Sequence, residues 1–278
     1  MSSPKIALFG INIISDPDLM LRVARRAEEL GYDSVWTGEH IVLPDPQEPP
    51  SPAPPQLPMV DTVATLSYLA AATTTIGLGT GIVILPQRRP AVLAKSLASL
   101  DHLSGGRLLF GLGVGYIPRE FAACDTPMER RGDRSDAYLD AMRALWTGDA
   151  VTISNEFVEF DRVTANPKPA QSDVHTVVGG HSRRAAVRAV TKAHGWFGYL
   201  RDLDTTRADI EVLRSVAGEV ERPEHLGEIE VSITPPFTPS ADDLAAYAEV
   251  GVDRLILALP FGRGDDAILE FVEANAPR

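Results

Sequence analysis

The order of apolar and polar residues predicts two buried strands within the segment 75–116. Thr75–Pro86 and Arg107–Tyr116 are rich in Ile, Leu, Val and Gly, which is typical of strands covered on both faces. Their glycines read GLGTG and GLGVG, but a dinucleotide fingerprint requires a helix that opens directly at the glycines. Because the first run continues as a strand through IVILP, we reject that interpretation.

The residues between these two strands have the pattern of a helix. Pro90 stands at a first helical position, and Gly105 with Gly106 ends the pattern. The apolar residues recur at helical spacing: Val92, Leu93, Leu97, Leu100 and Leu103. A strand, a helix and a strand in about forty residues form a parallel crossover, which is right-handed almost without exception.

The same alternation extends along the whole chain. Six further runs are predicted as strands: Lys5–Gly10, Ser34–His40, Val174–Gly180, Trp196–Leu200, Glu228–Thr234 and Arg254–Leu259. Further helices are predicted at 17–30, 61–72, 183–193, 204–217, 240–250 and 266–274, and one more helix is predicted to end near Trp146. A small hairpin is predicted from the strands Val151–Ser154 and Phe157–Asp161. Eight strands alternating with eight helices predict a single-domain (β/α)8 TIM barrel over residues 1–278, whereas a doubly wound sheet would need fewer strands.

Composition and charge exclude several classes of function. The net charge of −12 disfavours general nucleic-acid binding, whose affinity depends on neutralising phosphates. No apolar run reaches the ~18 residues of a membrane helix, and the N-terminus does not have the pattern of a signal peptide. Cys124 is the single cysteine, so no internal disulfide is expected. We expect a cytoplasmic protein with a small-molecule substrate.

A proline-rich segment follows the predicted strand Ser34–His40. Residues 44–58 contain eight prolines, so this segment is expected to be stiff and extended instead of helical. It follows a strand end, where barrel active sites lie. A lid over a pocket and a passive surface loop are both consistent with this position.

Residues that follow the predicted strands are the candidates for function, because barrel active sites lie at the strand C-termini. Three of these ends are rich in glycine, which lets a flat group approach the backbone. Before the helix that starts near Arg183, exposed amide groups and a serine hydroxyl suit a phosphate, although a plain turn capped by the serine is the alternative. The residues of this end are Gly179, Gly180, His181 and Ser182.

His40 ends a predicted strand beside Glu39. A neighbouring carboxylate can tune the pKa of a histidine, so acid–base catalysis and a merely packed histidine are both open. The other histidines do not form a metal-ligand set, and the four lysines lie away from the strand ends, which argues against a Schiff-base aldolase. Chemistry carried by a bound cofactor remains.

Several segments resemble the bacterial-luciferase-like flavin and deazaflavin oxidoreductases. They are GYDSVWTGEH at 31–40, the block 78–116, the stretch from Trp146 to Pro169 with its NPKP, and VGGHS at 178–182. The resemblance covers nearly the whole chain. It is closest to the branch that uses the deazaflavin coenzyme F420, and FMN is the alternative cofactor.

The resemblance implies a cofactor ring over the third strand, on a bulge with a non-prolyl cis peptide between Gly81 and Ile82. Glu39 and His40 match an acidic residue–histidine pair near the ring. The other matched positions are Thr80 at the bulge, Gly113, Val114 and Gly115 at the ring and ribityl chain, and Gly179, Gly180, His181 and Ser182 at the phosphate.

Two positions depart from the sugar-phosphate dehydrogenases of this family. Tyr116 replaces a catalytic glutamate, and Pro44 replaces a tryptophan, so a sugar phosphate is not the expected substrate. We expect Tyr116 to form a wall of the pocket.

The resemblance implies hydride transfer between the deazaflavin C5 and a small organic substrate. In this interpretation His40 exchanges a proton with the substrate or orients it, and Glu39 tunes His40 or contacts the cofactor. The alternatives are an FMN-dependent monooxygenase supplied by a separate reductase and a non-catalytic cofactor-binding barrel. The resemblance also implies a homodimer formed through the helices after strands two and three.

Overall fold

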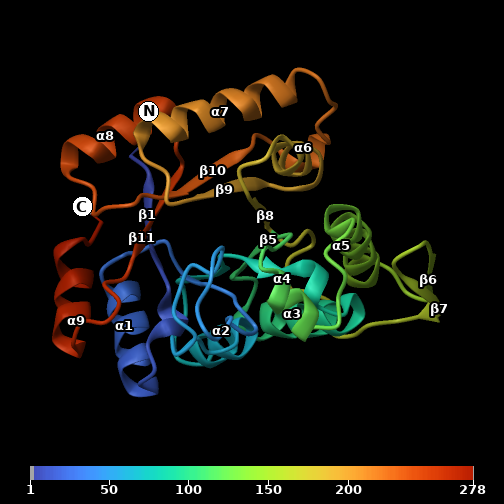
Figure 1. The fold of residues 1–278 in the computed structure, drawn as a ribbon, viewed down its shortest axis with the longest axis horizontal. Coiled ribbons are helices and arrows are strands. Elements are labelled where there is room, and N and C mark those ends of the chain that lie inside the picture. The colour runs from blue at the N-terminus through green and yellow to red at the C-terminus, as the bar shows by residue number, and fades with distance from the viewer. Residues whose placement is uncertain (1–2, 278) are drawn as a thin grey trace.

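The computed structural model describes residues 3–277, in which eight parallel strands close into a barrel (Figure 1). The strands follow one another around the barrel in the order β3-β2-β1-β11-β10-β9-β8-β5, and pairing of β5 with β3 closes it. Their bounds are β1 (Lys5–Phe9), β2 (Ser34–Thr37), β3 (Gly77–Thr80), β5 (Leu108–Gly113), β8 (Thr176–Gly179), β9 (Gly195–Tyr199), β10 (Glu230–Thr234) and β11 (Arg254–Ala258). The predicted TIM barrel is confirmed.

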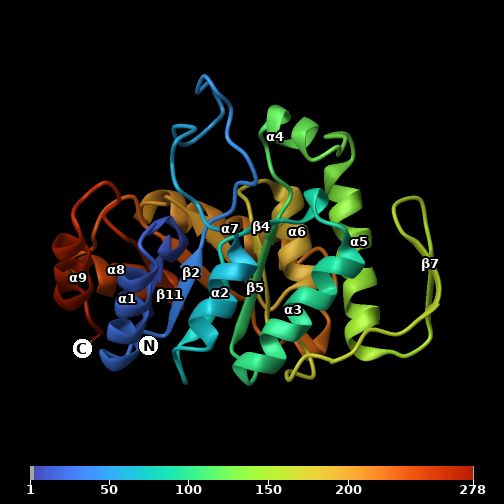
Figure 2. The same cartoon turned by 90° about the horizontal axis from the view of Figure 1, so that it is seen from below.

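Helices cover the outside of the barrel (Figures 1 and 2). They are α1 (Pro17–Glu29), α2 (Thr62–Ala70), α3 (Pro90–Ser104), α5 (Arg131–Thr147), α6 (Arg183–Lys192), α7 (Leu203–Ala217), α8 (Ala241–Val250) and α9 (Asp265–Ala274). A short helix that the sequence pattern did not predict, α4 (Pro118–Ala123), lies beyond the end of β5.

The predicted hairpin is present outside the barrel as β6 (Val151–Ser154) and β7 (Glu159–Val163). Its second arm begins two residues later than predicted. The side chain of Asn155 accepts hydrogen bonds from the amides of Phe157 and Val158, at 2.9 Å each, so these residues belong to the turn.

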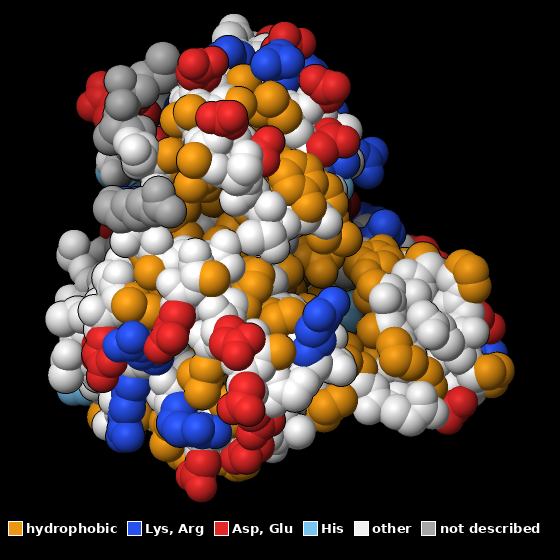
Figure 3. Space-filling view, turned by 90° about the vertical axis from the view of Figure 1, so that its left-hand side faces the viewer, with side chains coloured by type: hydrophobic (Ala, Val, Ile, Leu, Met, Phe, Trp, Pro, Cys, Tyr) orange, Lys and Arg blue, Asp and Glu red, His pale blue; other side chains and the backbone are white. Residues whose placement is uncertain are grey.

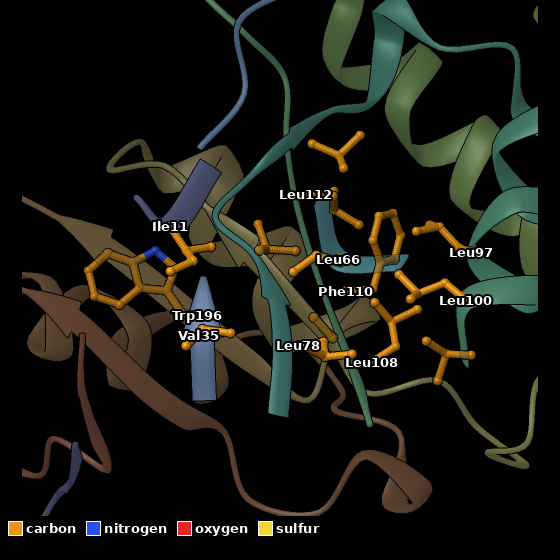
Figure 4. Close-up of a cluster of buried hydrophobic side chains, with 14 of the residues drawn as sticks. Ile11, Val35, Leu66, Leu78, Leu97, Leu100, Leu108, Phe110, Leu112 and Trp196 are labelled. Carbon is orange, nitrogen blue, oxygen red and sulfur yellow. The ribbon is translucent and has the colours of Figure 1, made fainter. Parts of the chain in front are cut away.

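The helix α3 begins and ends as the sequence predicts, with Pro90 in its first turn and Gly105 at its end with φ of 72°. That left-handed conformation favours glycine. However, Val92 and Leu103 are 67% and 76% exposed, so the apolar stripe of this helix is wider than its buried face. The side chains that pack on the barrel are Leu93, Leu97 and Leu100, the last two labelled in Figure 4.

The core has two layers, because successive strand residues point to opposite faces. The larger layer lies between the strands and the helices, and Figure 4 shows part of it. The smaller layer fills the barrel: Ala7, Phe9, Trp36, Val177, Phe197 and Ile256. A Cβ atom at Gly79 would lie 2.2 Å from Cδ2 of Trp36, so only glycine leaves room for this indole.

Residues 3–277 contain neither a membrane-spanning helix nor a group of metal-ligating side chains. No helix in this part of the chain is both long and apolar enough to cross a membrane. Nor do three or more His, Cys, Asp or Glu side chains there gather in a way that suits a metal ion.

Candidate functional site at the barrel mouth

The C-terminal ends of the strands form the barrel mouth, above which the proline-rich segment and α4 rise (Figure 2). The buried side chain of Asn12 ties the two ends of that segment together. Its amide nitrogen donates to the carbonyls of Gly38 at 2.9 Å and Val60 at 2.8 Å, and its oxygen accepts from the Gly38 amide. Arg119 of α4 adds an ion pair with Glu48 at 2.7 Å. The segment is therefore fastened both at its base and to α4.

His40 lies at this mouth in contact with a carboxylate of α4. Its Nδ1 is 3.2 Å from Oε2 of Glu120, and the amide of Ile41 donates to Oε1 of Glu120 at 2.6 Å. Glu120 is fully buried, while 12% of the His40 side chain is exposed. The carboxylate that holds His40 therefore comes from a helix that the sequence pattern missed. The one available signal was Pro118, a first-turn proline before an acidic residue.

The expectation that Glu39 tunes His40 is not what the structure shows. The Glu39 carboxylate accepts from the amide of Ile84 at 2.6 Å and pairs with Arg88, which also bonds Asp61 at 2.9 Å. Burial raises the pKa of Glu39, and the guanidinium of Arg88 opposes that rise. Glu39 is a buried anchor for the segment after β3, and a cavity of about 270 Å³ lies between these groups and His40.

The chain after β3 forms the bulge that the resemblance implied. The peptide bond between Gly81 and Ile82 is cis, and the strand resumes as β4 (Val83–Ile84) beside β5. The predicted continuous strand to Pro86 is thus interrupted. Gly81 and Ile82 are half-buried, but Thr80 is fully buried and its hydroxyl donates to the Gly111 carbonyl at 2.6 Å. The Thr80 side chain is therefore a strand-to-strand link.

The side chain of Ile82 explains two of the strand-end glycines. A Cβ atom at Gly113 would lie 2.5 Å from Cδ1 of Ile82, and one at Gly179 would lie 3.0 Å from its Cγ2. Gly115 has φ of 71°, and its Cβ would meet Ile84 at 2.6 Å. The chain's own isoleucines therefore require glycine at these positions, and the approach of a flat ligand stays a prediction. Val114 and Gly115 are half-buried beside them.

At the end of β8, Gly180, His181 and Ser182 are exposed before α6. The Ser182 hydroxyl accepts from the Ala185 amide at 3.2 Å, which is the N-cap interaction weighed as an alternative. Arg183 pairs with Glu219, and Trp196 donates to the Gly180 carbonyl at 2.7 Å. Although the residue is largely exposed, partial burial of its ring and the charge of Arg201 lower the pKa of His181. The first amides of α6 and the exposed glycine still suit a phosphate group.

One aromatic side chain packs on His40, and two others pack on each other at the strand ends. Tyr116 lies edge-on to the His40 ring, with centroids 6.1 Å apart, and Phe9 lies 5.2 Å from Tyr199. Burial raises the pKa of Tyr116, and the charges of Glu120 and Tyr199 add to this. Tyr116 is therefore neutral at ordinary pH, and its role as a wall of the pocket stays a prediction.

Comparison with known proteins agrees with this geometry. The family model described as luciferase-like monooxygenase matches residues 10–277. An uncharacterized protein of Mycobacterium tuberculosis is 32% identical over 253 residues, 88% of each chain. The F420-dependent hydroxymycolic acid dehydrogenase of that organism is 27% identical over 214 residues, 74% of this chain and 57% of the relative. The solved monooxygenase RslO1 of Streptomyces bottropensis shares the fold, with a TM-score of 0.79 and 21% identity over 98% of this chain and 97% of that one. The chain belongs to the luciferase-like monooxygenase family.

Proposed function

We propose that this protein is an F420-dependent oxidoreductase that transfers a hydride between the deazaflavin and a small organic substrate. The His40–Glu120 pair, held at the barrel mouth near the bulge, carries the proposal. Similarity to the F420-dependent hydroxymycolic acid dehydrogenase over 74% of the chain supports the choice of cofactor.

The residues at the mouth fit such a cofactor. Gly81 and Ile82 are half-buried at the bulge, and Val114 with Gly115 lies beside them. The segment 180–182 and the first turn of α6 would hold its phosphate. When bound, F420 supplies or accepts the hydride.

His40 can act as a general base or a general acid. Glu120 accepts from the Ile41 amide, and as a carboxylate it also accepts the Nδ1–H of His40. This fixes the tautomer, so Nε2 of His40 carries the lone pair that receives a proton from the substrate. Transfer in the other direction returns the proton from Nε2.

Replacement of His40 tests the proposal. We expect His40→Ala to lower turnover by about 10²- to 10⁴-fold, the usual contribution of acid–base catalysis, with the affinity for F420 nearly unchanged. The matched control is His102→Ala, which removes an exposed histidine of α3. Unchanged turnover in His40→Ala would remove this residue from the mechanism.

The family description, luciferase-like monooxygenase, also supports monooxygenase activity. We propose as the second candidate an FMN-dependent monooxygenase that a separate reductase supplies. This activity consumes oxygen in the presence of reduced FMN. Oxygen uptake coupled to substrate oxidation, with no turnover on F420, would favour it.

We also propose a homodimer that uses α2 and α3. These helices carry three exposed large apolar side chains, Tyr68 on α2 with Val92 and Leu103 on α3. Light scattering of the wild type and of Leu103→Lys tests this. A dimer that the substitution weakens is expected, and a wild-type monomer would contradict it.

A further inference from the structure

Exposed apolar side chains gather at the barrel mouth. Eight large apolar residues with more than a third of their surface exposed follow strand ends or border the proline-rich segment: Ile41, Val42, Val60, Tyr116, Tyr199, Leu200, Phe237 and Phe261. Phe261 also covers the end of β1, since a Cβ atom at Gly10 would lie 2.3 Å from its ring. Several exposed apolar side chains at one end of a barrel indicate a binding site.

A larger cavity opens beside this surface. It measures about 560 Å³ and lies at the ends of β10 and β11, against α9. Figure 1 shows α8 and α9 standing apart on that side of the barrel, and Figure 3 shows apolar side chains lining the hollow between them. The apolar residues that line it include Leu200, Phe237, Leu257, Ala267 and Phe271. Its volume is in the usual range for small-molecule pockets. We call it the side pocket.

The side pocket and the mouth adjoin at the end of β9. Leu200 lines it, and the preceding residue, Tyr199, packs on Phe9 with ring centroids 5.2 Å apart. The other side of Phe9 faces the bulge, because a Cβ atom at Gly81 would lie 3.1 Å from Cε2 of Phe9. Apolar contacts thus lead from the bulge through Phe9 to Tyr199, the residue that precedes Leu200 of the side pocket.

The arginines near the mouth are paired with carboxylates and therefore do not favour an anionic substrate, whereas the proposed cofactor phosphate would bind backbone amides of α6. Arg88 is paired with Glu39 and Asp61, and Arg119 is paired with Glu48. Arg201 is paired with Asp209 at 2.7 Å. In the side pocket, Arg263 and Glu270 contribute opposite charges. The net charge of −12 adds a repulsive field for anions.

We infer that the substrate is a neutral molecule with an extended apolar portion, which occupies the side pocket while the reacting group lies at His40. The position of the reacting group depends on the proposed function. Binding of the apolar portion depends on the side pocket alone.

Binding without cofactor tests the inference. The neutral fluorophore N-phenyl-1-naphthylamine is bound to the protein and then displaced with 2-butanone, 2-octanone, 2-dodecanone or dodecyl phosphate. We expect each added methylene of the ketones to strengthen displacement by roughly fourfold until the pocket is full, and dodecyl phosphate to compete less well than 2-dodecanone.

Two neighbouring substitutions on α9 provide a matched pair. Ala267→Trp fills the side pocket and is expected to weaken the binding of 2-dodecanone at least tenfold, with 2-butanone unchanged. Asp266→Trp adds the same side chain at an exposed position that does not line the pocket, and is expected to leave both affinities unchanged. Phe237→Asp, at an exposed position of the pocket, is a second test in case the tryptophan disturbs folding.

The outcomes separate this inference from the proposed function. Equal binding of 2-dodecanone by wild type and by both Ala267→Trp and Phe237→Asp, or tighter binding of dodecyl phosphate than of the ketone, would overturn the side pocket as the apolar subsite. These results do not depend on F420. Absence of F420 binding or of turnover, with ketone binding as expected, would instead overturn the proposed function.

Discussion

Replacing Glu120 with glutamine changes one hydrogen-bonding partner of His40 with little change of shape. The amide oxygen of glutamine still accepts from the Ile41 amide, as Oε1 of Glu120 does at 2.6 Å. Its NH2 group then faces Nδ1 of His40, where Oε2 lies at 3.2 Å. An NH2 group only donates, so Nδ1 must accept and the ring proton moves to Nε2. The lone pair proposed to receive the substrate proton is lost.

The magnitude follows from these two contacts. Loss of the correctly placed base is expected to lower turnover by about 10²-fold or more, within the range of acid–base catalysis. Glutamine keeps both hydrogen bonds but removes the charge of the carboxylate, which is expected to cost about 1 kcal/mol of unfolding free energy, or roughly 2 °C in Tm for a chain of this size. Because Glu120 is separate from the proposed phosphate site, F420 affinity is expected to change less than about twofold.

The assay measures turnover, F420 affinity and Tm for Glu120→Gln, with Glu129→Gln as a control at an exposed position. A double variant with His40→Ala decides the mechanism. Since Glu120 is proposed to act through His40, the double variant is expected to be no slower than His40→Ala alone. Full turnover in Glu120→Gln, or losses that multiply in the double variant, would refute the reasoning.

Three further predictions concern stability, each measured by urea denaturation. Gly111→Ala places a Cβ atom 1.9 Å from a backbone oxygen of β3, so it is expected to lower the free energy of unfolding by about 3 kcal/mol or more. The control Gly218→Ala, at φ of −79°, is expected to be neutral or to stabilise the protein by about 0.4–1 kcal/mol. Equal effects of the two substitutions would contradict this. Arg88→Met leaves the Glu39 carboxylate buried without its partner and is expected to lower the free energy of unfolding by about 3–5 kcal/mol. Adding Glu39→Gln to this variant should restore part of the lost stability. A loss below about 1 kcal/mol would contradict the ion pair. Burial opposes ionisation of Glu28, but hydrogen bonds from the segment before β3 lower its pKa to about 2, below the unfolded value of 4.5. Its stabilisation is therefore complete above about pH 4.5 and lost as the pH falls toward 2, and Glu28→Gln should remove this part of the pH dependence.

The barrel was predictable because its signals are periodic and repeated. Each strand is a short apolar run, and each helix has a start or stop residue such as Pro90 or Gly105. The pattern was less informative about exposure, since Val92 and Leu103 fit the apolar spacing yet face outward. The spacing of apolar residues shows how wide the apolar stripe of a helix is, but it does not show which residues of the stripe are buried.

The partner of His40 was not predictable from local patterns. Glu120 lies 80 residues further along the chain, on a six-residue helix that is too short to show a period. Glu39 was the adjacent carboxylate in the sequence, but neighbouring residues of an extended chain point to opposite sides, and Arg88 with the Ile84 amide holds it. The bulge at Gly81 was anticipated only through family resemblance.

Two binding titrations test the central claim most directly. The protein is titrated with F420 and, separately, with FMN, and the tryptophan fluorescence is followed; Trp196 bonds Gly180 at the proposed phosphate site and is a suitable reporter. F420 is expected to bind with a Kd near or below about 1 µM and FMN at least tenfold more weakly. Tighter binding of FMN, or binding of neither, would contradict the proposed F420 dependence.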